Sequence, residues 1–322
     1  DANHGLIVGF AGEILTTRDG GSNWTVQSHG TTQTLYGITF TDINTGTCVG
    51  ASGTILRTTD GGSSWISQDS GTISQLNEVV FTDTNTGTAV GEAGTILRTT
   101  DAGNQWNSQA SGTASLLFGL SFVDANTGAT VGQDGTILKT TDGGSHWQPQ
   151  TGGTTNFLFG VSFTDVNTGT AVGAGGTILR TTNGGGHWNP QTSGTTVPLH
   201  GVAFRDVNTG TAVGNSGTIL RTTDGGDHWG PQTSNTTDHL WDVSFSDTNN
   251  GTAVGEGGTI VRTTDGGSNW IVDFSGTFNT LYDVSFADAN TGTVVGDIGT
   301  ILRTTASGPS PTPTPRPTPS PR

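Results

Sequence analysis

Three carboxylates fall at one position of an internal repeat in which the other copies carry glycine. They are Glu78, Asp242 and Asp283, against Gly37, Gly119, Gly160 and Gly201. Paired carboxylates are the machinery of glycoside hydrolysis, one acting as acid and the other as base or nucleophile. The repeats are nearly alike and their connections are short, which leaves little chain to enclose a substrate. We therefore predict no enzyme and no catalytic residue, and a glycoside hydrolase is the least favoured function.

The residue before each carboxylate is aromatic in most repeats. This set is Tyr36, Phe118, Phe159, His200, Trp241 and Tyr282, with Asn77 in the remaining repeat. His239 and Phe157 lie two residues before Trp241 and Phe159. Aromatic rings gathered at a mouth stack on sugars or hold peptide side chains. We predict a ligand-binding cluster at these residues; the alternative is that they only fill the space between neighbouring elements.

A repeat of constant length must position these residues. The stretch from Gly53 to Trp65 recurs along the chain, and its tryptophans are spaced 41 residues apart. One unit indicates four short strands, at 35–40, 47–50, 54–58 and 64–68, separated by turns rich in Gly, Asp and Asn. This period predicts an all-β fold, a seven-bladed β-propeller of four-stranded blades over residues 1–305, with eight blades as the alternative.

The two ends of the repeat array raise a question of closure. The chain begins and ends in the same phase, because residues 1–9 align with residues 288–296. In a seven-bladed ring, we expect the strand at 281–286 to complete a blade begun by the N-terminal segment. One hairpin, either about 5–18 or 292–305, is then surplus. We expect it to cap an edge, stay loose or join a second molecule, so a homo-oligomer or fibre is a further prediction.

The turn of each repeat fits the Asp-box pattern, Ser/Thr-x-Asp-x-Gly-x-x-Trp, as in Thr58 to Trp65. The wider unit, for example Phe81 to Asp101, resembles the photosystem II stability/assembly factor-like family of BNR-like propellers. The resemblance covers residues 1–305 and implies a propeller whose Asp-boxes lie between the third and fourth strands of the blades. The chain departs from the family at Thr47, Thr88, Thr211 and Leu6, where members often carry Trp.

The Asp-box residues are predicted to be structural. The Asp would cap the turn and the Trp would pack between blades. One repeat carries Asn183 in place of the Asp, a change that a turn tolerates and a metal site does not. We predict no metal and no cofactor. The set comprises Asp19, Trp24, Asp60, Trp65, Asp101, Trp106, Asp142, Trp147, Asn183, Trp188, Asp224, Trp229, Asp265 and Trp270.

Composition limits the partners. The net charge is -15, which argues against nucleic acid and anionic membrane surfaces. No stretch of about 18 apolar residues could span a bilayer. The one cysteine, Cys48, stands where most other repeats have alanine, so we interpret it as a core residue.

Residues 306–322 form a separate Pro/Thr/Ser-rich segment, predicted to be a disordered or extended linker or stalk and open to O-glycosylation. This segment and the absence of Met suggest a secreted or cell-surface protein. The function favoured by these observations is a non-catalytic interaction or structural module with a protein or glycan partner. The alternative is a lectin-like, carbohydrate-binding propeller.

Overall fold

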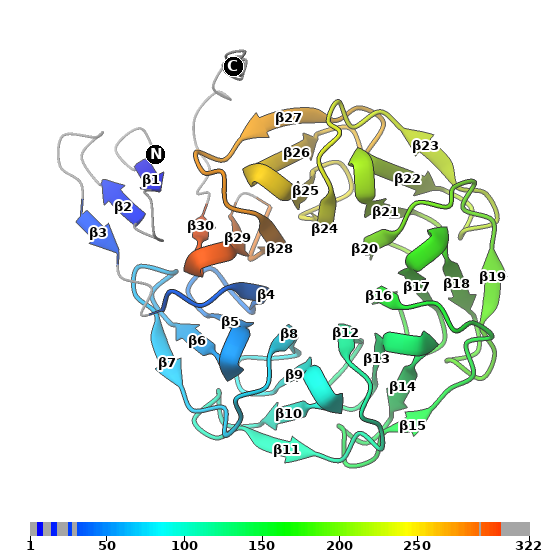
Figure 1. Cartoon of the computed structure of the whole chain (residues 1–322), viewed down its shortest axis with the longest axis horizontal. Helices are drawn as coiled ribbons and strands as arrows, with labels where there is room; N and C mark the ends of the chain where they lie inside the picture. Colours follow the sequence, from blue (N-terminus) through cyan, green and yellow to red (C-terminus); the bar gives the residue numbers. More distant parts are fainter. Residues whose placement is uncertain (1–4, 9–13, 18–24, 28–30, 290, 304–322) are drawn as a thin grey trace, which may run out of the picture.

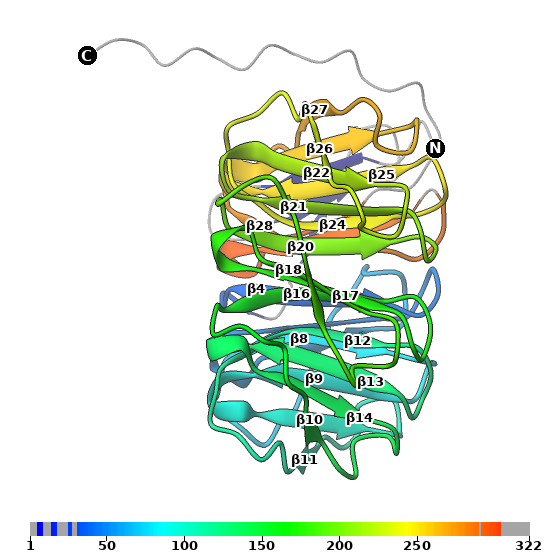
Figure 2. The ribbon, with the colours of Figure 1, turned by 90° about the vertical axis from the view of Figure 1, so that its right-hand side faces the viewer.

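The computed structural model describes the main chain of residues 5–8, 14–17 and 25–27, and residues 31–289 and 291–303. Seven sheets stand around a central channel like the blades of a propeller (Figure 1), and the ring forms a thick disc when seen from the side (Figure 2). This confirms the seven-bladed all-β prediction, and the eight-bladed alternative is not needed.

Each blade is an antiparallel meander whose strands run outward from the channel in chain order. A one-turn 3-10 segment joins the second strand to the third. The strands of blades one to four are β4 (Leu35–Phe40), β5 (Gly46–Gly50), β6 (Ile55–Thr58), β7 (Ile66–Gln68); β8 (Leu76–Phe81), β9 (Gly87–Gly91), β10 (Ile96–Thr99), β11 (Asn107–Gln109); β12 (Leu117–Phe122), β13 (Gly128–Gly132), β14 (Ile137–Thr140), β15 (Gln148–Pro149); and β16 (Leu158–Phe163), β17 (Gly169–Gly173), β18 (Ile178–Thr181), β19 (Asn189–Gln191).

Blades five to seven continue the same order, and the seventh has three strands among the described residues. The strands are β20 (Leu199–Phe204), β21 (Gly210–Gly214), β22 (Thr218–Thr222), β23 (Gly230–Gln232); β24 (Leu240–Phe245), β25 (Gly251–Gly255), β26 (Thr259–Thr263), β27 (Ile271–Phe274); and β28 (Leu281–Phe286), β29 (Gly292–Gly296), β30 (Ile301–Arg303). The 3-10 turns are η2 (Ala51–Gly53), η3 (Glu92–Gly94), η4 (Gln133–Gly135), η5 (Ala174–Gly176), η6 (Asn215–Gly217), η7 (Glu256–Gly258) and η8 (Asp297–Gly299).

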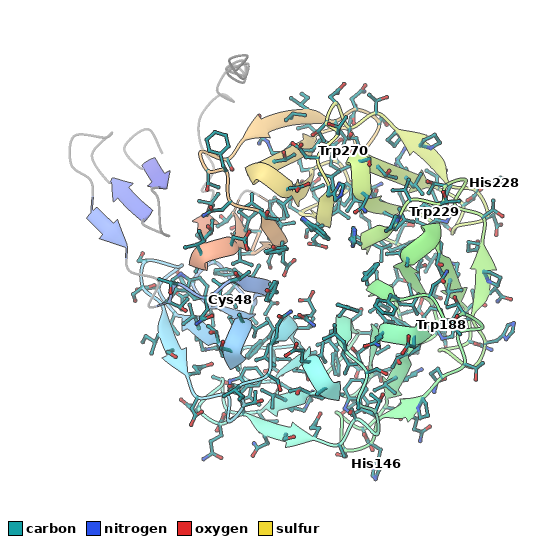
Figure 3. All side chains as sticks on the ribbon, in the orientation of Figure 1. Cys48, His146, Trp188, His228, Trp229 and Trp270 are labelled. Atoms are coloured by element: carbon teal, nitrogen blue, oxygen red, sulfur yellow. The ribbon has the colours of Figure 1, made fainter. Side chains whose placement is uncertain are left out.

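The core lies between blades. Val49 and Ile55 of blade one share a buried cluster with Leu76, Val79 and the other core residues of blade two. The same arrangement repeats around the ring, so each blade buries its apolar faces against both neighbours. Burying apolar side chains in this way is the main stabilising contribution in such a fold. Cys48 is fully buried in the cluster of blade one, where Figure 3 labels it, as predicted for a core residue.

Ring closure differs from the sequence prediction. Val295 and Ile301 of blade seven pack in one cluster with Leu35 and Ile38 of blade one. The strand at 281–286 pairs with 292–296, so it does not complete a blade begun by the N-terminal segment. That expectation was wrong because residues 292–303 follow the same strand pattern and themselves take this place, where Val295 and Ile301 pack against blade one.

The surplus hairpin is the N-terminal one. Strands β1 (Gly5–Val8), β2 (Ile14–Thr17) and β3 (Thr25–Gln27) form a separate three-stranded sheet beside blade seven (Figure 1). Self-assembly through this hairpin stays a prediction. The predicted linker at 306–322 and its O-glycosylation lie outside the described residues, as do Asp19 and Trp24.

The Asp-box turns have a structural arrangement. The Asp60 Oδ1 accepts hydrogen bonds from the Ser64 N–H (2.9 Å) and the Thr58 hydroxyl (2.8 Å). Asn183 Oδ1 accepts the His187 N–H in the same way at 2.9 Å, which explains why an amide replaces the acid there. The Asp-box tryptophans lie in the outer part of the blades; Figure 3 labels Trp188, Trp229 and Trp270, and Trp270 is 2% exposed.

The loops divide between the two faces of the disc. On one face, the Gly61 N–H donates to the Asn44 carbonyl, which joins the Asp-box turn to the turn after the first strand. On the other face, the Ala51 N–H donates to the Thr34 carbonyl, which joins the 3-10 turn to the segment entering the blade. We call the second face, which carries the 3-10 turns, the mouth face. The predicted aromatic residues open onto it.

Candidate ligand-binding mouth

A β-bulge aims the aromatic side chains at the channel. In blade one, the pairing of β4 with β5 shifts between Leu35 and Gly37, which leaves Tyr36 outside the ladder. The same shift occurs in the other six blades. A bulge of this kind redirects a side chain without ending the strand. Each blade therefore contributes one side chain to the mouth of the channel.

These side chains form an almost continuous ring of aromatic contacts. Centroid distances are 5.3 Å for Phe118–Phe159, 4.9 Å for Phe159–His200, 4.4 Å for His200–Trp241, 6.0 Å for Trp241–Tyr282 and 5.2 Å for Tyr282–Tyr36. The seventh member is Asn77, whose amide donates to the Leu117 carbonyl at 2.7 Å. The ring lines a cavity of about 260 Å³. The rings line the cavity and also contact one another from blade to blade, so ligand binding and packing between neighbouring elements both stay as interpretations of these residues.

His239 and Phe157 lie just outside this cavity. The His239 ring is 6.2 Å from Trp241, and its Nδ1 accepts the Ser216 N–H at 3.1 Å. Phe157 lies 6.4 Å from Phe159 and is 38% exposed on the mouth face. Two further apolar side chains of the same loops are more exposed, Ile73 at 91% and Phe278 at 72%. These three side chains add apolar surface to the mouth face, and the predicted site included only Phe157 among them.

The three carboxylates form the floor of the cavity with Gly119, Gly160 and Gly201. Asp242 and Asp283 hydrogen-bond each other, and both accept the Val284 N–H, at 3.4 Å and 2.7 Å respectively. Asp283 also accepts the Ile38 N–H of blade one at 2.5 Å. Glu78 accepts the Val79 N–H at 2.9 Å. The carboxylates are therefore not solvated surface groups, but partners of the innermost strands.

The close approach of the innermost strands explains why the other four blades carry glycine at the position of the carboxylates. A Cβ at Gly160 would lie 2.5 Å from the His200 carbonyl oxygen of the next blade. A contact that short cannot be relieved by a side-chain movement, because the oxygen belongs to the main chain. Glycine at this position therefore allows the blades to come together at the narrowest part of the ring.

Burial sets the ionisation of the floor. It raises the pKa of Glu78 well above its ordinary value, and the nearby Asp283 and Asp242 raise it further. Burial, followed by the charge of Asp283, likewise raises the pKa of Asp242. Asp283 is 7% exposed, and burial raises its pKa as well. Like charges this close do not all ionise together, so the floor carries less negative charge than three exposed carboxylates would.

Polar groups of the 3-10 turns support the aromatic ring. The Tyr282 hydroxyl donates to Asp297 Oδ1 at 3.3 Å, and burial followed by this charge raises the pKa of Tyr282 to about 12. His200 Nε2 lies 2.6 Å from Asn215 Oδ1, and burial lowers the pKa of His200. Sequence reasoning missed Asp297 and Asn215; the signal that could have found them is the variation of the 3-10 turn between otherwise constant repeats.

The mouth face carries acidic side chains, while most basic side chains bind main-chain groups of the opposite face. The 3-10 turns of the mouth face carry Glu92, Asp134, Glu256 and Asp297. Six basic side chains instead donate to main-chain carbonyls of turns on the opposite face, and these are Arg57, Arg98, Lys139, Arg180, Arg205 and Arg303. Among the described residues, no group of His, Cys, Asp and Glu is arranged to hold a metal ion.

Comparison with known proteins identifies the family. The family model described as "Photosynthesis system II assembly factor YCF48" matches residues 24–111 and 193–272, just over half of the chain. The chain belongs to this family. The resemblance stated from the repeat unit is thereby confirmed, and a search of the curated proteins finds no match.

Solved structures share the fold. The structure titled "YCF48 bound to D1 peptide" matches with a TM-score of 0.74 and 23% identity, covering 87% of this chain and 94% of that one. YCF48 from Cyanidioschyzon merolae gives 0.72 and 22%, covering 86% and 97%. The WD40 β-propeller domain of Doa1 gives 0.70 and 15%, covering 85% and 93%. At these identities the likeness shows the fold alone.

The predicted localisation was wrong. The matching family model and two of the matching structures are named for the photosystem II assembly factor YCF48, not for secreted or cell-surface proteins. A Pro-rich segment is also an ordinary semi-rigid spacer, so this composition by itself does not indicate export. Within the described ranges, no helix has the length and apolar character required to cross a bilayer.

Proposed function

We propose that this protein is a non-catalytic module that binds an extended, basic protein segment across the mouth face. The observation that carries the proposal is the aromatic ring around a cavity of about 260 Å³ with a carboxylate floor. A cavity of this size has room for a long side chain. Aromatic faces and carboxylates together attract a cation, so the inserted side chain is a lysine or arginine.

Charge complementarity supports a basic partner. The net charge of the chain is -15, and four acidic side chains stand on the turns around the mouth. Such a field attracts a cationic segment and repels an acidic one. The exposed Ile73, Phe157 and Phe278 add apolar contacts for the residues on either side of the inserted one. The relative whose structure is titled as bound to the D1 peptide is a further argument for a peptide partner.

The floor supports a binding role rather than hydrolysis. Asp242 and Asp283 hydrogen-bond each other, whereas the carboxyl groups of glycosidases stand about 5–9.5 Å apart to flank the bond that is cleaved. Both also accept main-chain N–H groups, and these bonds hold them in place as parts of the ring.

A peptide series tests this function. Three fluorescent 12-residue peptides of one sequence carry Lys, Gln or Glu at the same three positions. Anisotropy should show binding in the order Lys, Gln, Glu, weakened by salt. Trp241→Ala should reduce binding of the Lys peptide about tenfold or more, while His146→Ala, on the exposed Asp-box face, should leave it unchanged. Equal binding of the three peptides, or equal effects of the two variants, would refute the proposal.

A glycan ligand remains the second candidate, because Trp241, which lines the cavity, and the exposed Phe157 are also suitable for stacking on sugars. A glycan array, measured with the parent and with a Trp241→Ala, Phe157→Ala double variant, tests the glycan ligand separately from the peptide ligand. Identical array patterns would remove the lectin interpretation.

A further inference from the structure

The chain itself contains a segment with the chemistry that the mouth is proposed to bind. Residues 306–322, which we call the Pro/Arg segment, carry two of the eleven basic residues of the chain, Arg316 and Arg322, and none of its 26 acidic ones. The segment lies outside the described residues, and its chemistry follows from its sequence. It is a short basic part of a chain whose net charge is -15.

Proline gives the Pro/Arg segment a stiff, extended backbone. Every second residue from Pro309 to Pro321 is proline. Each proline fixes its own φ and restricts the residue before it, so the alternation favours the polyproline II conformation. Such a segment loses little conformational entropy when it is bound. It therefore presents Arg316, which stands between Pro315 and Pro317, on a backbone already suited to cross an open site.

One side of the mouth offers the surface on which proline docks. The Phe118 and Phe159 rings are 5.3 Å apart, and Phe157 lies 6.3 Å from the first and 6.4 Å from the second. Phe157 is also exposed on the mouth face. Grooves lined by aromatic rings are the usual binding sites of proline-rich segments, because proline rings pack flat against them. Blades three and four therefore supply contacts for the prolines on either side of an inserted residue.

The other side of the same cavity fits an arginine. Glu78, Asp242 and Asp283 line it together with Trp241. A guanidinium stacks on an aromatic face and donates to carboxylates through two parallel N–H groups, which the ammonium group of lysine cannot do. A positive charge placed among the three carboxylates also offsets the repulsion between them. Arginine flanked by proline thus matches both halves of the cavity.

The Pro/Arg segment leaves the ring on the face opposite the mouth. Strand β30 ends at Arg303, whose guanidinium donates to the Ile43 carbonyl of a turn on that face. Residues 304–315 precede Arg316 and span about 37 Å in the polyproline II conformation. The way to the mouth of the same molecule is about as long, with about 20 Å along the strands and about 14 Å back across blade seven. A second copy that turns its mouth toward that face needs no such detour.

We infer that the mouth binds the Pro/Arg segment of a second copy of this chain. The Arg316 guanidinium lies over the carboxylate floor, and Pro315 and Pro317 lie against the aromatic ring. This inference rests on the proposed function, since it names a partner for the same site. Each copy offers a mouth on one face and the segment on the other, so copies stack face to back. A contact between two different surfaces does not close a dimer, and the stack can grow into a chain of copies.

Two full-length variants that each lack one half of the contact test this arrangement. An Arg316→Gln, Arg322→Gln variant keeps the mouth, and Trp241→Ala keeps the segment. In sedimentation velocity at rising concentration, the parent should form dimers and larger species, while each variant alone should stay monomeric. An equimolar mixture of the two should form dimers and nothing larger, because only one mouth and one segment can pair.

A mixture that stays monomeric, or variants that associate as the parent does, would overturn the inference. Glu78→Gln, Asp242→Asn replaces Trp241→Ala as the mouth variant if the latter folds poorly. A parent that is monomeric at all concentrations would also overturn it, and weaker binding of added segment peptide to this parent than to the Arg316→Gln, Arg322→Gln variant would then assign the segment to its own mouth.

Peptide binding tests the placement of Arg316. A fluorescent peptide of residues 306–322 is titrated with the Arg316→Gln, Arg322→Gln protein, whose own segment competes least. Arg316→Gln in the peptide should weaken binding about tenfold, and Arg322→Gln by less than about twofold. A larger loss from Arg322→Gln would overturn the placement. If the Lys peptide described above binds and the segment peptide does not, this inference alone fails; if neither binds, the proposed function fails with it.

Discussion

The carboxyl groups of Asp242 and Asp283, from neighbouring blades, hydrogen-bond each other and share the N–H of Val284. This pair lies at the floor of the aromatic mouth, and it connects the stability of the ring to the charge of the site. An inserted cation would favour the ionised forms, while burial without a cation favours the protonated ones.

The raised pKa values of the floor predict that Asp242→Asn stabilises the folded protein more as the pH rises. A carboxyl whose pKa is higher in the folded state than in the unfolded state binds its proton more tightly when folded. Its unfavourable contribution is absent below the unfolded value near pH 4 and grows as pH rises through the folded value. Melting curves should show Asp242→Asn gaining stability over the parent between pH 4 and pH 8. A constant difference across this range would contradict the assignment.

The Asp-box carboxylates predict the opposite dependence. Hydrogen bonds from the His146 side chain and main chain lower the pKa of Asp142 to about 2. Its contribution to stability is therefore present above about pH 4 and is lost as pH falls toward 2. Asp142→Asn keeps the turn, as Asn183 does, and should lose less stability than the parent between pH 4 and pH 2. Denaturant unfolding of the parent and of Asp142→Asn at pH 4 and pH 2 measures how much stability each protein loses. Equal losses in the two proteins would contradict this prediction.

Trp106 should contribute strongly to the stability of blade two. It is 8% exposed and lies edge-on to Phe81 with a centroid distance of 5.9 Å. Trp106→Ala should lower the free energy of unfolding by about 3–5 kcal/mol. Ile66→Ala, at an outer-strand residue that is 68% exposed, should change it by less than about 0.5 kcal/mol. Similar losses in the two variants would mean that the Asp-box tryptophan is not a core residue.

The inner ring should not accept a methyl group at Gly160. A Cβ there would meet the His200 carbonyl oxygen, so Gly160→Ala should cost about 1–3 kcal/mol. Gly230→Ala is the matched control, since the nearest atom to a Cβ at Gly230 is the Arg221 carbonyl oxygen, 3.9 Å away. Chemical denaturation compares the two, and equal stability of both variants would show that the blades can separate slightly at the floor.

Much of the fold could be predicted from spacing. Residues 41 apart, such as Trp65 and Trp106, must occupy equivalent places, and the variants of the Asp-box, such as Asn183, already indicated a turn rather than a catalytic site. The aromatic residues and the carboxylates were also grouped correctly by position. What spacing cannot supply is the bulge at Tyr36, since it depends on how strands β4 and β5 pair.

Closure of the ring was the part that sequence could not decide. The hairpins at 5–17 and 292–303 share the glycines of the repeat and an Ile-Leu pair, Ile14-Leu15 and Ile301-Leu302, so their local preferences are similar. Which hairpin joins the strand at 281–286 depends on the contacts of Val295 and Ile301 with blade one, and these contacts exist only in the assembled ring. Asp297 was overlooked for a similar reason, because its bond to Tyr282 joins two segments of the blade that the repeat alone does not bring together.

The account rests on a cationic side chain entering the cavity above the carboxylate floor. A double-mutant cycle tests it most directly: the dissociation constant is measured for the Lys peptide and for a copy with one Lys replaced by Gln, each with the parent and with a Glu78→Gln, Asp242→Asn variant. For the inserted lysine, the account predicts that Lys→Gln weakens binding to the parent about tenfold and binding to the variant by less than about twofold. If every Lys→Gln change weakens binding to both proteins equally, no lysine reaches the floor, and the account is contradicted.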